Sequence, residues 1–455
     1  MSDTNSLTYS LPPLPFSNAD EAIDAIHAKE WAQSRPGLER IAELMALLGH
    51  PEKTLRIIHV AGTNGKGSFC AMLSSVLHAA GYRVGVNLSP PLYDFSERIQ
   101  IDRQPIPAPR LCAIASRIFS LIPEMSEPPT QFEIITAMSL VHFAEEACDF
   151  VVLEVGMGGR LDSTNVIPAP VLCAITSIGL DHTAFLGSTL TQIAKEKAGI
   201  LKSGTKAVFA AQAPEVTAEL QKAAEALGIP YVFVDEAQIT QQGWDVRRQH
   251  FTYRSDGPYH LALLGTYQTK NAALVLEAVR MLRTCGIDIS EDALKKGFPR
   301  AVHPGRFEII KTRPFWIADG AHNPAGAHAL AETLRECFPD QKCHILFGVF
   351  ADKDVDEMIR TLAPLAEKAY CITPPTERAL AGSALAAKWA ENAPDVPASA
   401  YSNLTEAVCA IECALAATDV VVACGSLSYL GAFRSLLQNR MGDLKSCTAG
   451  ICARP

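Results

Sequence analysis

Residues 55–68, LRIIHVAGTNGKGS, run from an apolar segment through a glycine-rich loop into a helical pattern. The apolar segment Leu55–Ala61 predicts a buried strand, and Ser68–Ala80 predicts a helix. Glycines in such a loop let backbone N–H groups turn toward an anion, and the dipole of the following helix adds positive potential. This order of strand, loop and helix therefore predicts a phosphate-binding loop at the edge of an α/β sheet.

Three side chains of this loop have the chemistry to hold a nucleotide. Lys66 supplies a positive charge for the β- and γ-phosphates, and the hydroxyls of Thr63 and Ser68 suit phosphate or Mg²⁺. The spacing departs from the usual GxxxxGKS/T pattern, because Gly67 separates Lys66 from Ser68. A chance glycine-rich turn is the alternative interpretation.

Around this loop, short apolar runs alternate with helical patterns, which indicates a sheet covered by helices on both faces. Alternating polar and apolar positions over residues 243–264 suggest an antiparallel pair of strands. The segment GFPRAVHPG, residues 297–305, is rich in proline and glycine and marks a break. The predicted class is α/β, with an N-terminal P-loop-type, mostly parallel sheet domain over residues 1–298. A linker over 299–306 and a smaller C-terminal Rossmann-like α/β domain over 307–455 follow.

Two further features fall where predicted strands end. Glu154 lies in the apolar strand FVVLEV, residues 150–155, just before the loop GMGGRLDS. Open α/β sheets bind ligands at the carboxyl ends of their strands, so Glu154 is a candidate Mg²⁺ ligand; a structural or capping acid is the alternative. Asp181–His182 follows another apolar strand, and the same edge would bring His182 near the phosphate loop. A histidine with a purely structural role is the alternative there.

The predicted second domain carries the segment DGAHNP, residues 319–324, after a strand. Asp319 is a candidate acceptor for ribose hydroxyls, and His322 is a candidate contact to the nucleotide or to a carboxylate. Arg306 lies just past the linker, where it can reach back across a cleft toward phosphate. A plain turn and a surface salt bridge are the alternatives for these two features.

The composition excludes several classes of protein. Of 455 residues, 48% are hydrophobic and 20% are charged, so a large core can be buried and global disorder is excluded. The net charge of −9 argues against broad contact with nucleic acid or an anionic membrane. No apolar segment is long enough to span a bilayer, and residues 1–22 lack the pattern of a secretory signal. With 13 cysteines and no CxxC pair, a reducing, cytoplasmic environment is expected.

Nine segments occur in an order that is specific to one family. With them, the chain resembles folylpolyglutamate synthase/dihydrofolate synthase, of the Mur ligase superfamily, over about residues 20–435. The segments are AGTNGKGS (61–68), SPPLYDFSERI (89–99), PTQFE (129–133), LEVGMGGRLDSTN (153–165), LDHTAFLGSTLTQIAKEKAGI (180–200), HPGRFE (303–308), DGAHNPAGA (319–327), GVFADKD (348–354) and ACGSLSYLG (423–431).

The resemblance implies an ATP-dependent amide ligase that acts on dihydropteroate, on folates, or on both. The carboxylate of the pterin substrate attacks the γ-phosphate of ATP to give an acyl phosphate, and the amine of L-glutamate then displaces phosphate. Two Mg²⁺ ions are implied as cofactors, with a monovalent cation as a further candidate. The expected partners are these small molecules alone, with neither nucleic acid nor membrane, and the expected oligomeric state is a monomer.

Site residues are implied position by position. The family's nucleotide contacts fall on Thr63, Asn64, Gly65, Lys66, Gly67, Ser68, Asn271, Arg306, Asp319 and His322. Its metal ligands fall on Ser89, Glu154, His182 and, once carbamylated, Lys197. Its substrate contacts fall on Thr130, Gln131, Phe132, Glu133, Leu161, Asp162, Ser163 and Ser426. Catalytic roles are expected for Lys66, His182, Lys197 and His322.

One departure and three alternatives remain. The family usually reads SPHL where this chain has Pro91 after Ser89-Pro90, which leaves the contacts of that loop open. PTQFE favours an enzyme with both activities over a monofunctional folylpolyglutamate synthase. PTQFE and DHTAFLG also argue against another Mur-type amino-acid ligase. Since every expected phosphate and metal residue is present, a nucleotide-binding regulator without catalysis is disfavoured.

Overall fold

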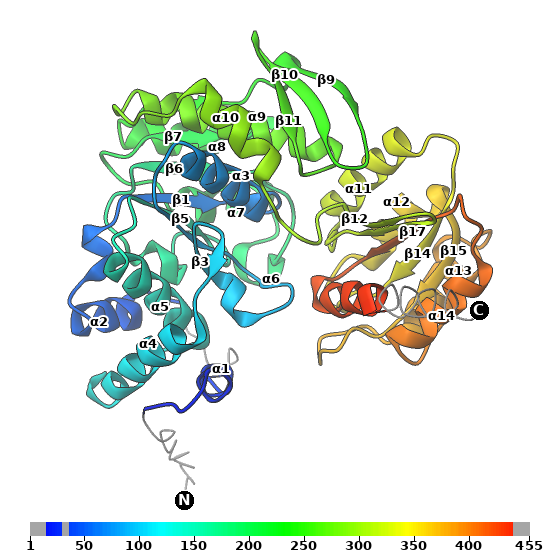
Figure 1. The fold of residues 1–455 in the computed structure, drawn as a ribbon, viewed down its shortest axis with the longest axis horizontal. Coiled ribbons are helices and arrows are strands. Elements are labelled where there is room, and N and C mark those ends of the chain that lie inside the picture. Colours follow the sequence, from blue (N-terminus) through cyan, green and yellow to red (C-terminus); the bar gives the residue numbers. More distant parts are fainter. Residues whose placement is uncertain (1–14, 30–35, 440–455) are drawn as a thin grey trace, which may run out of the picture.

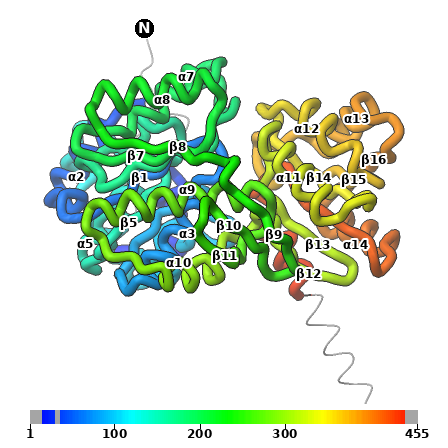
Figure 2. The backbone as a smooth tube through the Cα atoms, turned by 90° about the horizontal axis from the view of Figure 1, so that it is seen from above, coloured from blue at the N-terminus to red at the C-terminus, as the bar shows by residue number. Residues whose placement is uncertain are grey.

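A computed structural model describes residues 15–29 and 36–439 of the protein. Two α/β lobes lie side by side, with a small sheet between them (Figure 1, Figure 2). Residues 1–14, 30–35 and 440–455 lie outside the described residues. Within the described ranges, no helix combines the length and the apolar character needed to cross a membrane.

The larger lobe is built on an eight-stranded sheet in the order β4-β3-β2-β5-β1-β6-β7-β8. All neighbours from β2 to β8 pair in parallel, and β3 and β4 form an antiparallel edge. The strands are β1 (Ile57–Ala61), β2 (Val84–Asn87), β3 (Ile99–Ile101), β4 (Gln104–Pro105), β5 (Phe150–Glu154), β6 (Leu172–Ile175), β7 (Ala207–Phe209) and β8 (Tyr231–Phe233).

Helices cover both faces of this sheet. They are α1 (Ala19–His27), α2 (Glu39–Leu47), α3 (Lys66–Ala79), α4 (Ala108–Leu121), α5 (Gln131–Glu145), α6 (Thr183–Leu186), α7 (Leu190–Ala198), α8 (Pro214–Ala226), α9 (Thr266–Arg283) and α10 (Glu291–Gly297). On β5, Phe150 and Val152 face the core that contains α3, whereas Val151 and Leu153 face the core that contains α5. A strand buried on both faces is apolar at most positions, which explains why β1 and β5 are mainly apolar. The exceptions are His59, whose ring bonds the Thr164 hydroxyl over 2.9 Å, and Glu154 at the end of β5.

The smaller lobe is built on a six-stranded sheet in the order β12-β13-β17-β14-β15-β16. Only β12 pairs antiparallel with its neighbour. Its elements are β12 (Glu308–Thr312), β13 (Phe315–Ala318), α11 (Pro324–Cys337), β14 (Cys343–Phe347), α12 (Val355–Leu362), β15 (Ala366–Cys371), α13 (Gly382–Asn392), β16 (Ala398–Ala400), α14 (Leu404–Ala414) and β17 (Val420–Cys424). The two sheets confirm the predicted α/β class. The domain limits at 298 and 307 stay a prediction.

The small sheet holds three strands where the sequence predicts two. They are β9 (Ile239–Trp244), β10 (Gln249–Tyr253) and β11 (Asp256–Leu261), all antiparallel. The first, ITQQGW, has no buried residue, so it lacks the alternation that marks β10. At its end, Trp244 packs edge-on against Phe338, which follows α11 of the smaller lobe.

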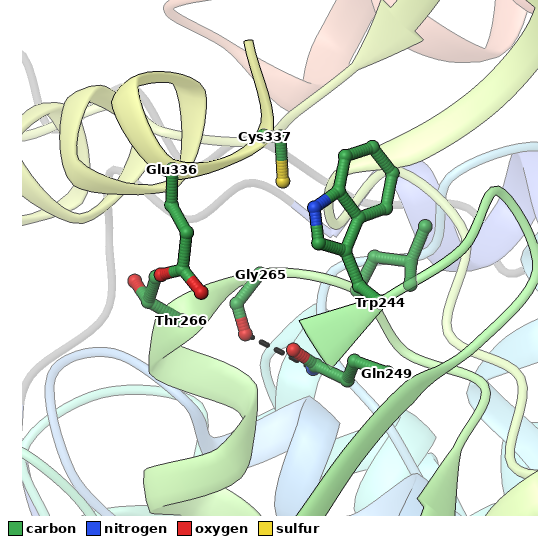
Figure 3. A pocket seen from close by; sticks show the side chains of 7 residues that line it. Trp244, Gln249, Gly265, Thr266, Glu336 and Cys337 are labelled. Carbon is green, nitrogen blue, oxygen red and sulfur yellow. Dashed lines mark hydrogen bonds between the residues drawn. The ribbon is translucent and has the colours of Figure 1, made fainter. Parts of the chain in front are cut away.

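A hollow of about 10 Å³ lies beside Trp244, between the small sheet and the end of α11 (Figure 3). Gln249 closes one side of it by donating from its side-chain amide to the carbonyl oxygen of Gly265, over 3.0 Å. This volume has room for about one water molecule, so the hollow is a packing defect at the junction of the lobes and not a ligand site.

Candidate active site

A cleft of about 620 Å³ separates the two lobes, and it brings together residues that are far apart in the sequence. All fourteen residues expected to bind nucleotide or metal line it, and they are Thr63, Asn64, Gly65, Lys66, Gly67, Ser68, Ser89, Glu154, His182, Lys197, Asn271, Arg306, Asp319 and His322. The larger lobe supplies most of them, and the segment that begins with Arg306 closes the cleft from the other side.

The phosphate loop leaves β1 after Ala61 and enters α3 at Lys66. Gly62 and Gly65 both have positive φ, +148° and +90°, which side chains disfavour. There is also no room for a Cβ, because at Gly62 it would collide with the hydroxyl of Thr176. At Gly65 a Cβ would come within 2.5 Å of Asn271 Oδ1. The loop backbone can therefore lie directly on a ligand, as a phosphate cradle requires.

Two lysine amines converge on one carbonyl oxygen of this loop. Lys66 Nζ donates to Gly62 O and Thr63 O over 3.1 and 3.2 Å, and Lys197 Nζ donates to Gly62 O over 2.8 Å. The Lys197 side chain is buried. Burial, reinforced by repulsion from Lys66, lowers the pKa of Lys197 to about 7. Near neutral pH much of this amine is thus uncharged and nucleophilic, the form that reacts with CO₂.

Glu154 ends β5 at the base of the cleft and is buried. One carboxylate oxygen accepts the backbone N–H of Ser89 over 2.9 Å. Burial raises the pKa of Glu154, although Lys66, Arg306 and Arg98 act in the opposite direction. No cation among the described residues forms an ion pair with it. A buried carboxylate beside a serine, without a bonded cation, fits a Mg²⁺ site, since Mg²⁺ prefers oxygen ligands.

His182 begins the short helix α6 with a left-handed backbone, at φ +49°. Its N–H donates to the side chain of Asp181 over 2.8 Å, which fixes this turn. The ring is open to the cleft, yet loss of solvent against the cleft walls lowers its pKa to about 4. Lys353 and Lys66 add to that shift, and Asp181 opposes it. The imidazole is therefore neutral at pH 7, with a lone pair available for a metal.

Across the cleft, protein donors already hold the carboxylate of Asp319. It accepts the Tyr267 hydroxyl over 2.9 Å and the N–H groups of Phe307 and Ala321, each over 2.8 Å. Burial raises the pKa of Asp319. Arg306 Nη1 donates to Gly305 O over 3.3 Å, and among the described residues the surface salt bridge considered for it is absent.

The residues expected to bind substrate do not line this cleft, but several contact its wall. Phe132 lies against Gly156, where an added Cβ would come within 2.5 Å of the ring. Asp162 accepts the N–H of Met157 over 2.9 Å and so holds the glycine loop. Of the others in the larger lobe, Thr130, Gln131 and Glu133 form the start of α5, Ser163 bonds Thr136, and Leu161 is half-buried. Ser426 belongs to the smaller lobe, where it follows β17 and precedes the cleft residue Leu427.

Sequence reasoning missed several residues of the cleft. Tyr267 and Lys270 line it from α9, the helix that also carries Asn271. Their only signal is that they precede Asn271 by one helical turn or less. Among the described residues, no group of three or more His, Cys, Asp or Glu could hold a metal. The expected metal ligands are consistent with this, since they include a serine and a lysine.

Comparisons with known proteins show the family of the chain. The Mur ligase middle domain matches residues 60–279, and the Mur ligase glutamate ligase domain matches residues 305–427. The dihydrofolate synthase/folylpolyglutamate synthase of Bacillus subtilis is 38% identical over 365 residues, which are 77% of this chain and 84% of that protein. The chain belongs to the dihydrofolate synthase/folylpolyglutamate synthase family. This membership confirms the resemblance read from the nine segments.

Two solved structures of the same family extend the match to the whole fold. Mycobacterium tuberculosis folylpolyglutamate synthase complexed with ADP and AMPPCP superposes with a TM-score of 0.84 at 32% identity, over 92% of this chain and 98% of that one. Escherichia coli FolC in complex with DHPP and ADP gives 0.83 at 29% identity, over 94% and 100%. In the family to which this chain belongs, the two-lobed arrangement thus accompanies nucleotide binding.

Gly65→Ala is expected to weaken ADP binding by about ten-fold or more and to lower stability, because the new Cβ presses on Asn271 at a strained φ. Gly81→Ala is the matched control. Gly81 has φ +94°, and a Cβ added there would have no atom within 4 Å. Both variants should lose about 1 kcal/mol of unfolding free energy to backbone strain. Calorimetric titration with ADP should separate them. Equal ADP affinities would show that the loop is not the phosphate site.

Proposed function

We propose that the cleft between the lobes activates a pteroate or folate carboxylate as an acyl phosphate and passes it to L-glutamate. The chain is an ATP-dependent ligase of its family, and the proposal concerns its substrates and the roles of its residues. The observation that carries it is the meeting of Lys66, Glu154, Lys197 and Arg306 in one cleft. A carboxylate and a triphosphate repel each other, and such a cleft lets cations stand between them.

On the nucleotide side, Lys66 leaves the loop carbonyls to which it now donates and binds the β- and γ-phosphates. The N-terminus of α3 directs its free N–H groups at the same phosphates. Arg306 approaches from the smaller lobe and neutralises charge on the γ-phosphate. Asn271, Asp319 and His322 hold the rest of the nucleotide, with the carboxylate of Asp319 kept in place by its three protein donors.

On the metal side, Ser89, Glu154 and His182 would hold one Mg²⁺, and Lys197, as its carbamate, would help hold a second. When bound, these ions supply Lewis-acid stabilisation to the phosphoryl transfer. The chain prepares the ligands: the Ser89 N–H orients the carboxylate of Glu154, and burial of Lys197 leaves its amine free to take up CO₂. Carbamylation turns a cation into an anionic oxygen ligand.

On the acceptor side, the ring of Phe132 offers a stacking surface for the pterin next to the glycine loop. The Glu133 carboxylate forms an ion pair with Arg40 over 3.1 Å and accepts the N-cap backbone N–H of α5. Its role is therefore to shape this wall. Ser426, beside the cleft residue Leu427, lies where the incoming glutamate would enter. Both activities are proposed, because the segment PTQFE favours an enzyme that accepts dihydropteroate as well as tetrahydrofolate polyglutamates.

The test is an assay of ADP formation by the purified protein with ATP, Mg²⁺ and L-glutamate. Dihydropteroate and tetrahydrofolate are supplied in separate reactions, and mass spectrometry of the products should show one added glutamate. If ADP is formed neither with dihydropteroate nor with tetrahydrofolate, the proposal is contradicted. Activity with tetrahydrofolate alone would identify a monofunctional folylpolyglutamate synthase. Activity with nucleotide-linked peptides instead would identify another Mur-type ligase. Light scattering of the same preparation should show the monomer that we propose for this cytoplasmic enzyme.

A further inference from the structure

The loop GVFADKD, residues 348–354, carries a lysine that reaches into the other lobe. Lys353 Nζ lies 2.5 Å from Asp181 Oδ1, and only 7% and 8% of the two side chains are exposed. Lys353 does not line the cleft. Its ammonium therefore makes a contact between the lobes and does not bind a ligand in the cleft.

Two asparagines extend this contact. Asn323 donates to Asp181 Oδ2 over 3.0 Å, and the side-chain amides of Asn323 and Asn64 pair with each other through two hydrogen bonds of 3.2 Å. Asn64 and Asp181 belong to the larger lobe, and Asn323 and Lys353 belong to the smaller one. We call these four residues the interlobe clasp. It is enclosed and fully polar, and every one of its bonds joins the two lobes.

The clasp is connected to both halves of the proposed chemistry. Asn64 is part of the phosphate loop, next to Thr63 and Gly65. Asp181 uses the oxygen that binds Lys353 to accept the N–H of His182 as well, over 2.8 Å. Closing the clasp therefore fixes the turn that presents His182 and places the smaller lobe over the phosphates.

We propose that Lys353 is a positioning residue, whose ion pair with Asp181 holds the lobes closed and keeps the His182 turn in its working geometry. This rests on the proposed function, because the geometry matters only if the cleft binds a nucleotide. Removing the ammonium leaves the enclosed carboxylate with only Asn323, over 3.0 Å, and the His322 ring, 3.5 Å away, as side-chain partners from the smaller lobe, which destabilises the closed arrangement. A ligand that binds only the closed arrangement then loses affinity in proportion to the fraction of closed molecules.

The experiment compares Lys353→Met with Lys388→Met and Lys353→Arg. Lys388 makes an ion pair of 2.8 Å with Asp356 within the smaller lobe, where both side chains are half-buried, so its loss tests the same change without a contact between lobes. ADP affinity is measured by calorimetric titration, which needs no turnover. The radius of gyration is measured by small-angle X-ray scattering, and kcat and KM for ATP are measured by ADP release.

For Lys353→Met, we expect ADP affinity to fall about ten-fold or more, with a larger radius of gyration that ADP brings back toward that of the wild type. The KM for ATP should rise more than kcat falls. Lys388→Met should match the wild type, and Lys353→Arg should recover most of the affinity, because it keeps the charge.

Wild-type ADP affinity and radius in Lys353→Met would overturn the proposal, even with a lower melting temperature, since a merely structural ion pair would give that result. Should Lys353→Met not fold, Lys353→Gln keeps a hydrogen-bond donor and supplies the same comparison. The proposed function fails separately, when the wild type releases no glutamate-dependent ADP. In that case, the ADP affinity and the radius of gyration of Lys353→Met still test whether the clasp holds the lobes closed.

Discussion

Replacing Glu154 with Gln is expected to reduce glutamate-dependent ADP formation by about 10³-fold or more, while the protein stays folded. The amide keeps the shape of the side chain but removes the negative charge that faces the metal. Burial raises the pKa of Glu154, so its ionised form costs stability in the folded chain. The variant should therefore melt at the same temperature as the wild type or higher at neutral pH. That gain should vanish below the ordinary carboxyl pKa, where the residue is protonated in both states.

Glu277→Gln is the control for this result. Glu277 is also a buried glutamate, but it lies on α9 away from the cleft, bonded to the Tyr253 hydroxyl over 2.7 Å and to Arg280 over 2.9 Å. We expect the opposite outcome: a lower melting temperature with kcat nearly unchanged, because the amide removes the negative charge that pairs with Arg280 and, over 3.0 Å, with Arg254. Calorimetry and the ADP assay measure both properties. Near-normal turnover in Glu154→Gln would remove Glu154 from the metal site.

Lys197→Met is expected to reduce kcat by about 10²-fold or more, and added bicarbonate should not restore it, because methionine cannot form a carbamate. In CO₂-free buffer the same change should stabilise the fold. Burial lowers the pKa of Lys197 from 10.5 to about 7, so its charged form is disfavoured in the folded chain. The penalty is complete below pH 7, on the order of a few kcal/mol, and disappears as the pH rises toward 10.5.

Lys202→Met supplies the matched comparison. Lys202 is a half-buried lysine that donates to the carbonyl oxygens of Asn165 and Ile167, outside the cleft. Burial lowers the pKa of Lys202 as well, but this side chain is only half-buried and loses two hydrogen bonds, so the gain in stability should be absent or smaller than for Lys197→Met, and kcat should stay unchanged. Mass spectrometry of the intact wild type should also show one CO₂ adduct that Lys197→Met lacks. Wild-type turnover in Lys197→Met would refute the role of the carbamate.

Local patterns in the sequence were sufficient to predict the features whose position depends on a single strand or helix. The phosphate loop follows the mainly apolar strand β1, and Glu154 ends the mainly apolar strand β5, so their place at the carboxyl edge could be predicted without the partner strands. The α/β class followed from the same runs. The family assignment used longer segments, and the comparisons confirm it.

Other features depend on contacts that no local pattern encodes. Lys353 lies 172 residues from Asp181, and its segment predicts only a turn before a helix. Strand β9 is polar and exposed between its half-buried ends, Ile239 and Trp244, so alternation could not reveal it. Tyr267 joins the cleft through Asp319, a contact that exists only when the second lobe is in place.

Because Trp244 packs on Phe338, its intrinsic fluorescence reports on the contact between the small sheet and the smaller lobe. The half-buried indole of Trp244 lies where the small sheet meets the smaller lobe, whereas Trp316 and Trp389 are buried inside the smaller lobe. Separation of the lobes would expose the Trp244 ring to water and leave Trp316 and Trp389 unchanged; the fourth tryptophan, Trp31, lies outside the described residues and would be replaced by Phe for this measurement. Red-shifted indole fluorescence would thus register opening in solution, in real time and without any attached dye.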